Sequence, residues 1–184
     1  VQDIARLGTR ITLGLANPRE LLALKQSLAA LPEISAQLTL LHSQLLVESF
    51  ETWDQAEDLY DLIERAIRPD APLSLRDGNI IQEGYAPEID ELRKASKEGK
   101  EWIAALEGRE RERTGIESLK VRYNQVFGYY IEITKANLAR VPPDYTRKQT
   151  LVNAERFTTA ELQELEERVI GADVKLLASE QEAF

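Results

Sequence analysis

The spacing of apolar residues predicts helices in the first part of the chain. Between residues 21 and 31 a leucine recurs every three or four positions, which places the leucines on one face of a helix. We expect this helix to begin at Asn17, because a capping asparagine followed by Pro18 and by Glu20 is a strong N-terminal signal.

Two more amphipathic helices are expected to follow. Pro32 ends the first helix and can open the next. The apolar stripe of this second helix consists of Ile34, Leu38, Leu41 and Leu45. Asp54 and Glu57 are spaced as a capping pair for a third helix. The inward-facing residues of the third helix are predicted to be Leu59, Ile63, Ala66 and Ile67. Helices of this kind, joined by short breaks, indicate a packed bundle.

Turn-forming residues interrupt the helical pattern between residues 68 and 86. Asp77-Gly78 is a frequent two-residue turn, and apolar residues flank it at 73–75 and 80–81. This arrangement predicts a small β-hairpin centred on the Asp-Gly pair.

Two long helical patterns dominate the rest of the chain. Residues 87–113 are nearly all charged apart from a narrow apolar stripe, and a helix of that length would reach roughly 40 Å. In residues 158–184, which open with a capping box from Thr158 to Glu161, apolar residues recur every seven positions from Leu162. If the two helices pack antiparallel, the residues between them lie at the far end of the pair.

Residues 116–157 follow a period of two, which is typical of strands. The runs 119–124 and 127–134 alternate apolar and polar residues, and a short turn separates them. Residues 146–151 form a third run, and 152–157 can return as a fourth strand. The predicted fold class is therefore α+β and mainly α: a helical bundle whose two long helices carry a small antiparallel sheet at their tip.

Charge is distributed unevenly along the chain. The 184 residues include 23 Lys and Arg against 32 Asp and Glu, which gives a net charge of −9. Residues 118–157 hold seven basic and three acidic residues, a net charge of +4, so the remainder carries −13. A cationic sheet on an acidic body suits a polyanion such as DNA. Alternatively, the cations only keep an exposed sheet face solvated and protect its edges from pairing.

Composition excludes several kinds of site. The chain has no cysteine, which excludes disulfides, thiol nucleophiles and cysteine-based metal sites. His42 is the single histidine, and it is expected to be a surface residue rather than a ligand. No nucleophile–base pair, metal cluster or phosphate-binding loop of the Gly-x-x-x-x-Gly-Lys-Ser/Thr type is evident. No apolar run approaches the roughly 18 residues of a membrane span. We therefore predict no catalytic residue, no metal ligand, no cofactor and no membrane partner for this chain.

Several motifs resemble the MutS family of DNA mismatch-repair proteins. Two of them, which are highly specific, resemble that family's clamp region: Tyr123–Asn137 and Arg147–Phe157. Others resemble its lever, or core, domain and the point where the lever enters the clamp: Asn17–Leu21, Arg76–Gly78, Gly99–Trp102 and Glu110–Ser118. The resemblance covers essentially the whole chain in order.

The resemblance implies a domain organisation and partners. Residues 1–115 would be the first part of the lever, 116–157 the inserted clamp, and 158–184 the returning lever helix. In this family a dimer encircles duplex DNA and the clamp touches its backbone without reading sequence. The lever relays conformational change from an ATPase that uses ATP and magnesium, and a MutL-type protein is a further partner. A bacterial, cytoplasmic and nucleoid-associated location is also implied.

Specific residues follow from the same resemblance. Asn124 and Asn153 match clamp asparagines that approach phosphate, and a side-chain amide can donate to phosphate oxygens. Gln125 and Val152 lie beside them; many relatives carry Lys at position 152, so Val152 offers only a backbone amide. Three basic residues could supply counterion release, or could serve only solubility: Arg122, Arg147 and Lys148.

The DNA-binding interpretation depends on placement. It expects Asn124 and Asn153 to stand together at an exposed extremity of the molecule, remote from the acidic helices. The alternative is a structural coiled-coil module whose tip sheet binds a protein partner. Salt dependence of binding to a fully paired duplex distinguishes the two interpretations.

Overall fold

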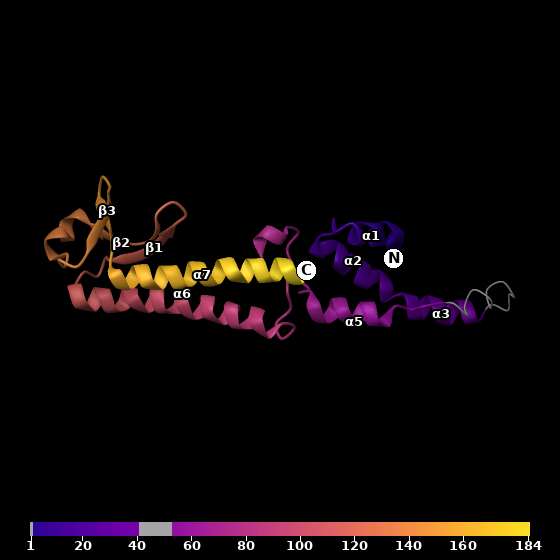
Figure 1. Cartoon of the computed structure of the whole chain (residues 1–184). Helices are drawn as coiled ribbons and strands as arrows, with labels where there is room; N and C mark the ends of the chain where they lie inside the picture. The colour runs from indigo at the N-terminus through magenta and orange to yellow at the C-terminus, as the bar shows by residue number, and fades with distance from the viewer. Residues whose placement is uncertain (1, 41–52) are drawn as a thin grey trace. The chain divides into compact units, whose positions relative to one another are not determined.

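The computed structural model describes residues 2–40 and 53–184 of the chain (Figure 1). These residues form two compact units, one within residues 1–89 and 177–184 and the other within residues 90–176. The predicted stripe residues Leu41 and Leu45, and also His42, lie outside the described residues.

Short helices build the first unit. They are α1 (Ile4–Thr12), α2 (Pro18–Leu28), α3 (Leu31–Thr39) and α5 (Glu57–Ala66). The predicted start of α2 is confirmed, because Asn17 and Glu20 exchange backbone-to-side-chain hydrogen bonds of 3.1 Å in a capping box. The sequence did not reveal α1, which Asp3 caps and which buries only Leu7 fully.

The start of α5 differs from the prediction. The carboxylate of Asp54 accepts a hydrogen bond from the amide of Ala56 (2.8 Å) and does not cap the helix. Ala56 itself adopts the left-handed conformation (φ 51°), and α5 begins after it without a side-chain cap. The Asp54–Glu57 capping pair is therefore wrong. The inward face is confirmed for Ile63, Ala66 and Ile67, whereas Leu59 is exposed.

The hairpin predicted around Asp77-Gly78 is also wrong. Residues Leu75–Asp77 form a turn of 3₁₀ helix, η1, and strands do not pair across it. Ile81 instead forms an isolated bridge with Ile67 at the end of α5. The carboxylate of Glu180 accepts hydrogen bonds from the amides of Asn79 (2.5 Å) and Ile81 (3.4 Å). A buried carboxylate thus takes the place that the predicted partner strand would have had.

Two long helices run side by side in the second unit (Figure 1). They belong to α6 (Pro87–Thr114) and α7 (Ala160–Ala183), as the sequence predicted. Asp173 accepts a hydrogen bond from Ser96 and pairs with Lys100 at 3.1 Å, while Arg109 pairs with Glu161. Early residues of α6 therefore meet late residues of α7, so the helices are antiparallel. The capping hydrogen bond of α7 comes from Thr159, which accepts from the amide of Leu162.

A four-stranded antiparallel sheet packs on this helix pair. Its strands are β1 (Lys120–Asn124), β2 (Gly128–Thr134), β3 (Thr146–Thr150) and β4 (Ala154–Thr158), in the order β1-β2-β4-β3. A 3₁₀ helix, η2 (Lys135–Arg140), follows β2. All four predicted strands are present, and the fold class α+β, mainly α, is confirmed.

One hydrophobic core joins the sheet to both helices. Ile131, Ile133 and Phe157 on the inner sheet face are buried with Leu106 of α6 and Leu162 of α7, in a cluster that also includes Leu165 and Val169. The two long helices thus share a compact unit with the sheet. The finer domain boundaries at residues 115/116 and 157/158 stay a prediction. None of the described helices is long and apolar enough to cross a bilayer.

Substitution by alanine is expected to have opposite effects on stability at the two glycines of α6. A Cβ added at Gly99 would lie 2.5 Å from Cγ2 of Val169, which is buried and stiff, whereas a Cβ at Gly108 would meet nothing within 4 Å. Gly108→Ala should stabilise the chain by about 0.5–1 kcal/mol, because alanine loses less entropy in a helix. Gly99→Ala should destabilise it by about 1–3 kcal/mol through overpacking. Urea denaturation measures both, and a stabilising Gly99→Ala would contradict the close helix contact.

Candidate nucleic-acid interface

The turn between β1 and β2 orients Asn124. Asn124 ends β1 and lies opposite Gly128. Its side-chain oxygen accepts hydrogen bonds from the backbone amides of Val126 (2.8 Å) and Phe127 (3.3 Å), a bonding pattern that makes asparagine a turn former. Because the oxygen faces the backbone, the NH₂ group of Asn124 is left to donate, and it has no partner among the described residues. The neighbouring Gln125 is exposed.

Lys148 of β3 is hydrogen-bonded to the backbone at this turn. The register of β3 against β4 shifts between Arg147 and Gln149, which leaves Lys148 as the extra residue of a β-bulge. Its ammonium group donates to the carbonyl oxygens of Phe127 (3.1 Å) and Tyr129 (3.4 Å). Only 24% of its side chain is exposed, which favours a structural role over the predicted phosphate contact.

The turn between β3 and β4, residues 151–153, is the second candidate contact. The backbone oxygen of Asn153 accepts a hydrogen bond from the amide of Lys135 (3.1 Å), which fixes the turn to the end of β2. The side chain of Asn153 is exposed, and Val152 is 85% exposed. This turn therefore presents an amide and an apolar side chain to solvent.

The two asparagines lie at opposite ends of the sheet. Asn124 is opposite Gly128, where β2 begins, whereas Asn153 precedes Ala154, which is opposite Thr134 at the end of β2. Six residue steps of about 3.3 Å separate these ends of β2 by about 20 Å. The expectation that both residues stand together at one extremity is therefore wrong. In Figure 1 both turns nevertheless project on the same side of the helix pair.

Each predicted cationic contact has a carboxylate within ion-pair distance. The pairs are Arg122–Glu132 (3.9 Å), Arg147–Glu155 (2.7 Å) and Lys148–Glu166 (3.8 Å). The side chain of Arg147 is 61% exposed, but that of Glu155 is only 8% exposed. Arg122 and Arg147 therefore keep surface that a phosphate could reach, and removing Arg147 would also leave a buried carboxylate unpaired.

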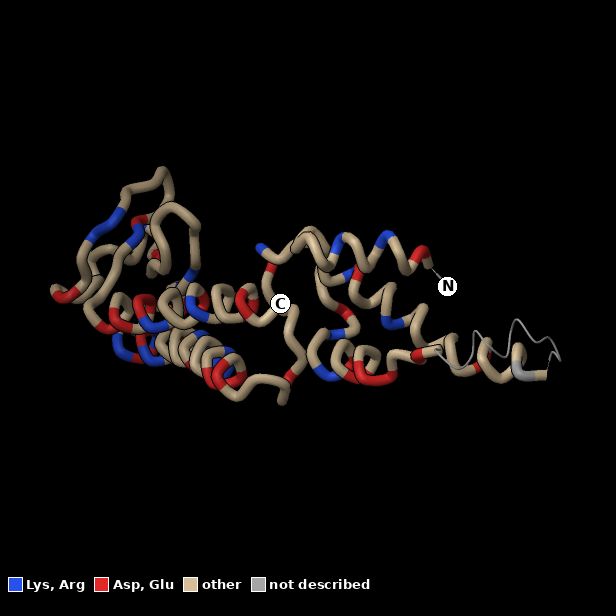
Figure 2. Tube along the Cα trace, turned by 45° about the vertical axis from the view of Figure 1, so that its right-hand side comes forward, with Lys and Arg blue, Asp and Glu red and all other residues tan. Residues whose placement is uncertain are grey.

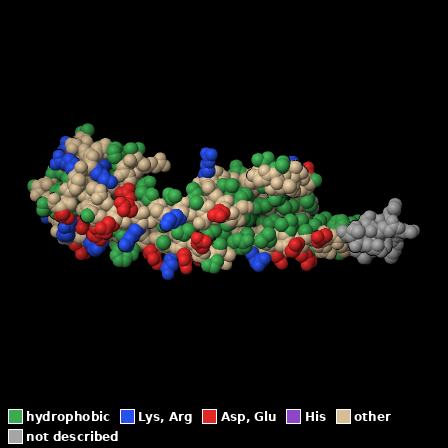
Figure 3. All heavy atoms as spheres, viewed as in Figure 1, with side chains coloured by type: hydrophobic (Ala, Val, Ile, Leu, Met, Phe, Trp, Pro, Cys, Tyr) green, Lys and Arg blue, Asp and Glu red, His purple; other side chains and the backbone are tan. Residues whose placement is uncertain are grey.

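Three exposed basic residues that the sequence did not single out have no ion-pair partner in the described part of the chain: Lys120, Lys135 and Arg140. Lys120 begins β1 opposite Glu132, and Lys135 follows the end of β2, so both lie at the Asn153 end of the sheet. Figures 2 and 3 show basic residues gathered over the sheet, whereas acidic and basic residues mix along the helices. Lys120 faces Glu132 across the strands but forms no ion pair with it. Such distances cannot be inferred from the sequence, which is why sequence reasoning missed these cations.

The polar side chains on the outer face of the sheet contact one another. The guanidinium group of Arg156 lies 4.2 Å above the ring of Tyr130 and donates to Gln149 (2.8 Å) and Glu132 (3.4 Å). Tyr130 is buried beneath it and lies opposite Arg122 in the register. Tyr130 thus has the cross-strand environment that the sequence favoured over stacking on a ligand.

Comparison with known proteins identifies the family. Residues 84–174 match MutS family domain IV. The whole chain is 53% identical to the DNA mismatch repair protein MutS of Symbiobacterium thermophilum, 53% to that of Methanothrix thermoacetophila and 52% to that of Halothermothrix orenii. The chain belongs to the MutS family. It spans about a fifth of the length of these curated relatives, covering 21%, 22% and 20% of them.

The family assignment confirms the resemblance seen in the sequence. The segment that matches domain IV of MutS largely coincides with the second compact unit, residues 90–176. Domain IV is not the ATPase domain of MutS. The Asp and Glu side chains of residues 2–40 and 53–184 form no group of three or more that could hold a metal ion.

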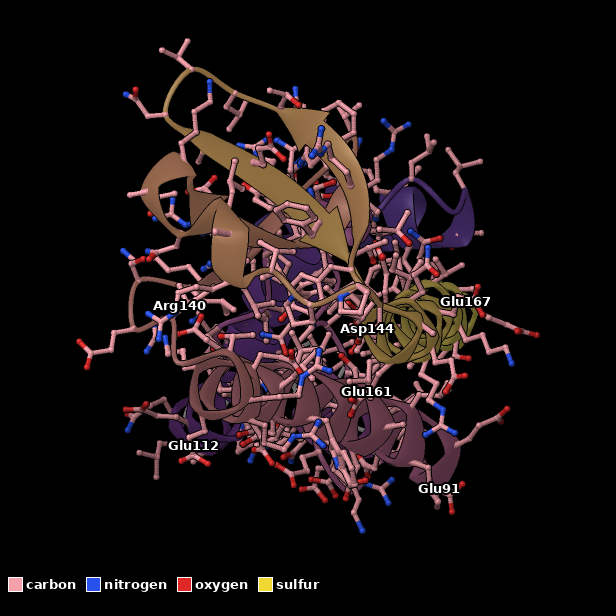
Figure 4. The ribbon with its side chains drawn as sticks, turned by 90° about the vertical axis from the view of Figure 1, so that its left-hand side faces the viewer. Glu91, Glu112, Arg140, Asp144, Glu161 and Glu167 are labelled. Atoms are coloured by element: carbon pink, nitrogen blue, oxygen red, sulfur yellow. The ribbon has the colours of Figure 1, made fainter. Side chains whose placement is uncertain are left out.

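A polar cluster connects the sheet of this MutS domain to the end of α6. The hydroxyl of Tyr145 donates to the buried carboxylate of Glu110, which also pairs with Arg113 at 2.8 Å. Burial raises the pKa of Tyr145, and its hydrogen bond to Glu110 raises it further, so the hydroxyl stays a donor. Arg113 lowers the pKa of Asp144 through a hydrogen bond. Figure 4 shows Asp144 between the sheet and the helices, and Glu161 of α7 on the side of α6.

Removal of the Tyr145 hydroxyl tests this cluster. Tyr145→Phe should destabilise the chain by about 1–2 kcal/mol, because Glu110 loses a donor while it stays buried. Tyr85→Phe removes the same group from an exposed side chain and should change stability by less than about 0.5 kcal/mol. Chemical denaturation compares the two variants, and equal stabilities would contradict the proposed connection.

Proposed function

We propose that this MutS chain contacts the backbone of duplex DNA non-specifically through the two turns of its sheet. The β1–β2 turn would contribute the NH₂ group of Asn124, with Gln125 beside it. The β3–β4 turn would contribute Asn153 and the backbone amide of Val152. Lys135 and Lys120 would supply charge at this second turn, and Arg122 and Arg147 would add to it.

The orientation of Asn124 carries this proposal. Its oxygen is occupied by the amides of Val126 and Phe127, so the group that it can offer to a ligand is a donor. A donor held in a turn suits a phosphate oxygen and carries no sequence information. Non-specific contact is what the family resemblance implies for this region.

The separation of the turns suits two phosphates of one duplex. About 20 Å along β2 equals the rise of about six base pairs at roughly 3.4 Å each. Because one strand winds to the far face of the duplex over that length, the two turns would contact phosphates of different strands. Because both turns project on the same side of the helix pair in Figure 1, one duplex could reach both. The sheet would therefore hold the duplex at two separate turns instead of at one site.

Family membership extends the proposal beyond this chain. We infer that the full-length protein couples the grip to an ATPase that uses ATP and magnesium, with the long helices as the lever. A second copy and a MutL-type protein would be its partners. The chain has no phosphate-binding loop motif, so its own proposed contacts do not involve nucleotide.

A protein partner is the second candidate. Val126 and Val152, one at each turn, are 80% and 85% exposed, and exposed apolar side chains favour a protein contact. Binding through these residues would depend little on salt.

Salt titration of binding to a fully paired duplex tests the DNA proposal in the full-length protein. The affinity should fall steeply with salt. Asn124→Ala should lower it about 3- to 10-fold at every salt concentration without changing the slope, because the lost donor is neutral. Lys135→Ala should reduce the slope by about 0.9, the value for one phosphate contact.

The matched control is Lys97→Ala, which removes the same charge from an exposed position on α6. It should change neither the affinity nor the slope. Lys135 is preferred to Arg147 as the test position because its removal leaves no buried carboxylate behind. Binding that ignores salt, or a Lys135 variant that behaves like the control, would contradict the proposal and favour the protein partner.

A further inference from the structure

The β1–β2 hairpin extends beyond the strand that should cover its edge. β4 pairs with β2 only from Ile131 to Thr134, so the backbone of Tyr129 has no strand beside it on that edge. Exposed strand edges need donors and acceptors for their free backbone groups. Two side chains supply them here. Glu166 of α7 accepts the amide of Tyr129 (3.0 Å), and Lys148 donates to its carbonyl oxygen (3.4 Å).

Glu166 fits closely against the start of β2. A Cβ added at Gly128 would lie 1.6 Å from Oε1 of Glu166, so only glycine allows this approach, and Gly128 also has a positive φ of 68°. The side chain of Glu166 is 13% exposed, and Lys148 lies 3.8 Å from its second oxygen. A carboxylate with so little solvent forms a strong, charge-assisted hydrogen bond to an amide.

We propose that Glu166 is a positioning residue for the DNA contact made by Asn124. Glu166 accepts a hydrogen bond from the amide of Tyr129 and so fixes the start of β2, next to the register pair of Asn124 and Gly128. The turn between these two residues contains the amide that orients the side chain of Asn124. Because Glu166 belongs to α7, a rotation of that helix would move the Asn124 contact. Asn153 lies at the other end of β2 and is not held by Glu166. The inference rests on the proposed DNA contact of Asn124.

Substitutions at Glu166 separate charge from hydrogen bonding. In Glu166→Leu the amide of Tyr129 loses its acceptor, whereas Glu166→Gln keeps an acceptor oxygen and loses only the charge. Glu167 is the matched control, because it is the next residue of α7, is exposed, and lies on the outer side of the helix in Figure 4. Glu167→Leu and Glu167→Gln remove the same groups without touching the turn.

The first measurement is amide hydrogen exchange in the full-length protein without DNA. Glu166→Leu should speed the exchange of the Val126 and Phe127 amides at least tenfold and leave the amides of residues 151–153 unchanged. Glu166→Gln should retain most of the protection, and the Glu167 variants should retain all of it. Unchanged exchange at Val126 and Phe127 in Glu166→Leu would overturn the inference, whatever the DNA affinity.

The second measurement is a double-mutant cycle of DNA affinity. If Glu166 acts through the turn, Glu166→Leu combined with Asn124→Ala should bind no more weakly than Asn124→Ala alone, a non-additive result. Combined with Asn153→Ala, the losses should multiply. Multiplying losses in both combinations would overturn the positioning role. Failure of the DNA proposal itself would be visible separately, as an Asn124→Ala variant with normal affinity.

Discussion

Burial of the inner sheet face against α6 and α7 is the constraint on which the rest of this MutS domain depends. Ile131, Ile133 and Phe157 share one core with Leu106 and Leu162, so the sheet cannot turn independently of the helix pair. The contact of Gly99 with Val169 brings the helices close enough to present a joint apolar surface. The two turns are therefore held at fixed positions along α7, and this is the property that a backbone contact requires.

The distribution of charge over the sheet differs from what the sequence suggested. The local charge of +4 suggested a freely available cationic surface, but the predicted cations are paired with acids or used inside the sheet. Lys148 holds a turn, and Arg156 covers a tyrosine ring. The unpaired charge is concentrated at the Asn153 end, at Lys120 and Lys135. The proposed contact with phosphate thus combines an oriented neutral donor at Asn124 with a more strongly charged end of the sheet at Asn153.

The periodicity of apolar residues predicted the helices and strands well, but it did not predict which strands pair. The period of two located all four strands, and the heptad pattern located α7, because side-chain periodicity is a local property. Strand order is not local. The sequence allows β4 to lie beside β2 or beyond β3, and only the actual order, β1-β2-β4-β3, places Asn124 and Asn153 at opposite ends. In the same way, the Asp77-Gly78 hairpin failed because Glu180, about a hundred residues away, takes the backbone amides.

We propose that two separate turns of the sheet hold one duplex. Ethylation interference on a fully paired duplex tests it most directly, because it reports which phosphates the full-length protein needs. We expect two clusters of interfering phosphates about 20 Å apart, one lost in Asn124→Ala and the other in Asn153→Ala. A single cluster that weakens equally in both variants, or no interference at all, would contradict it.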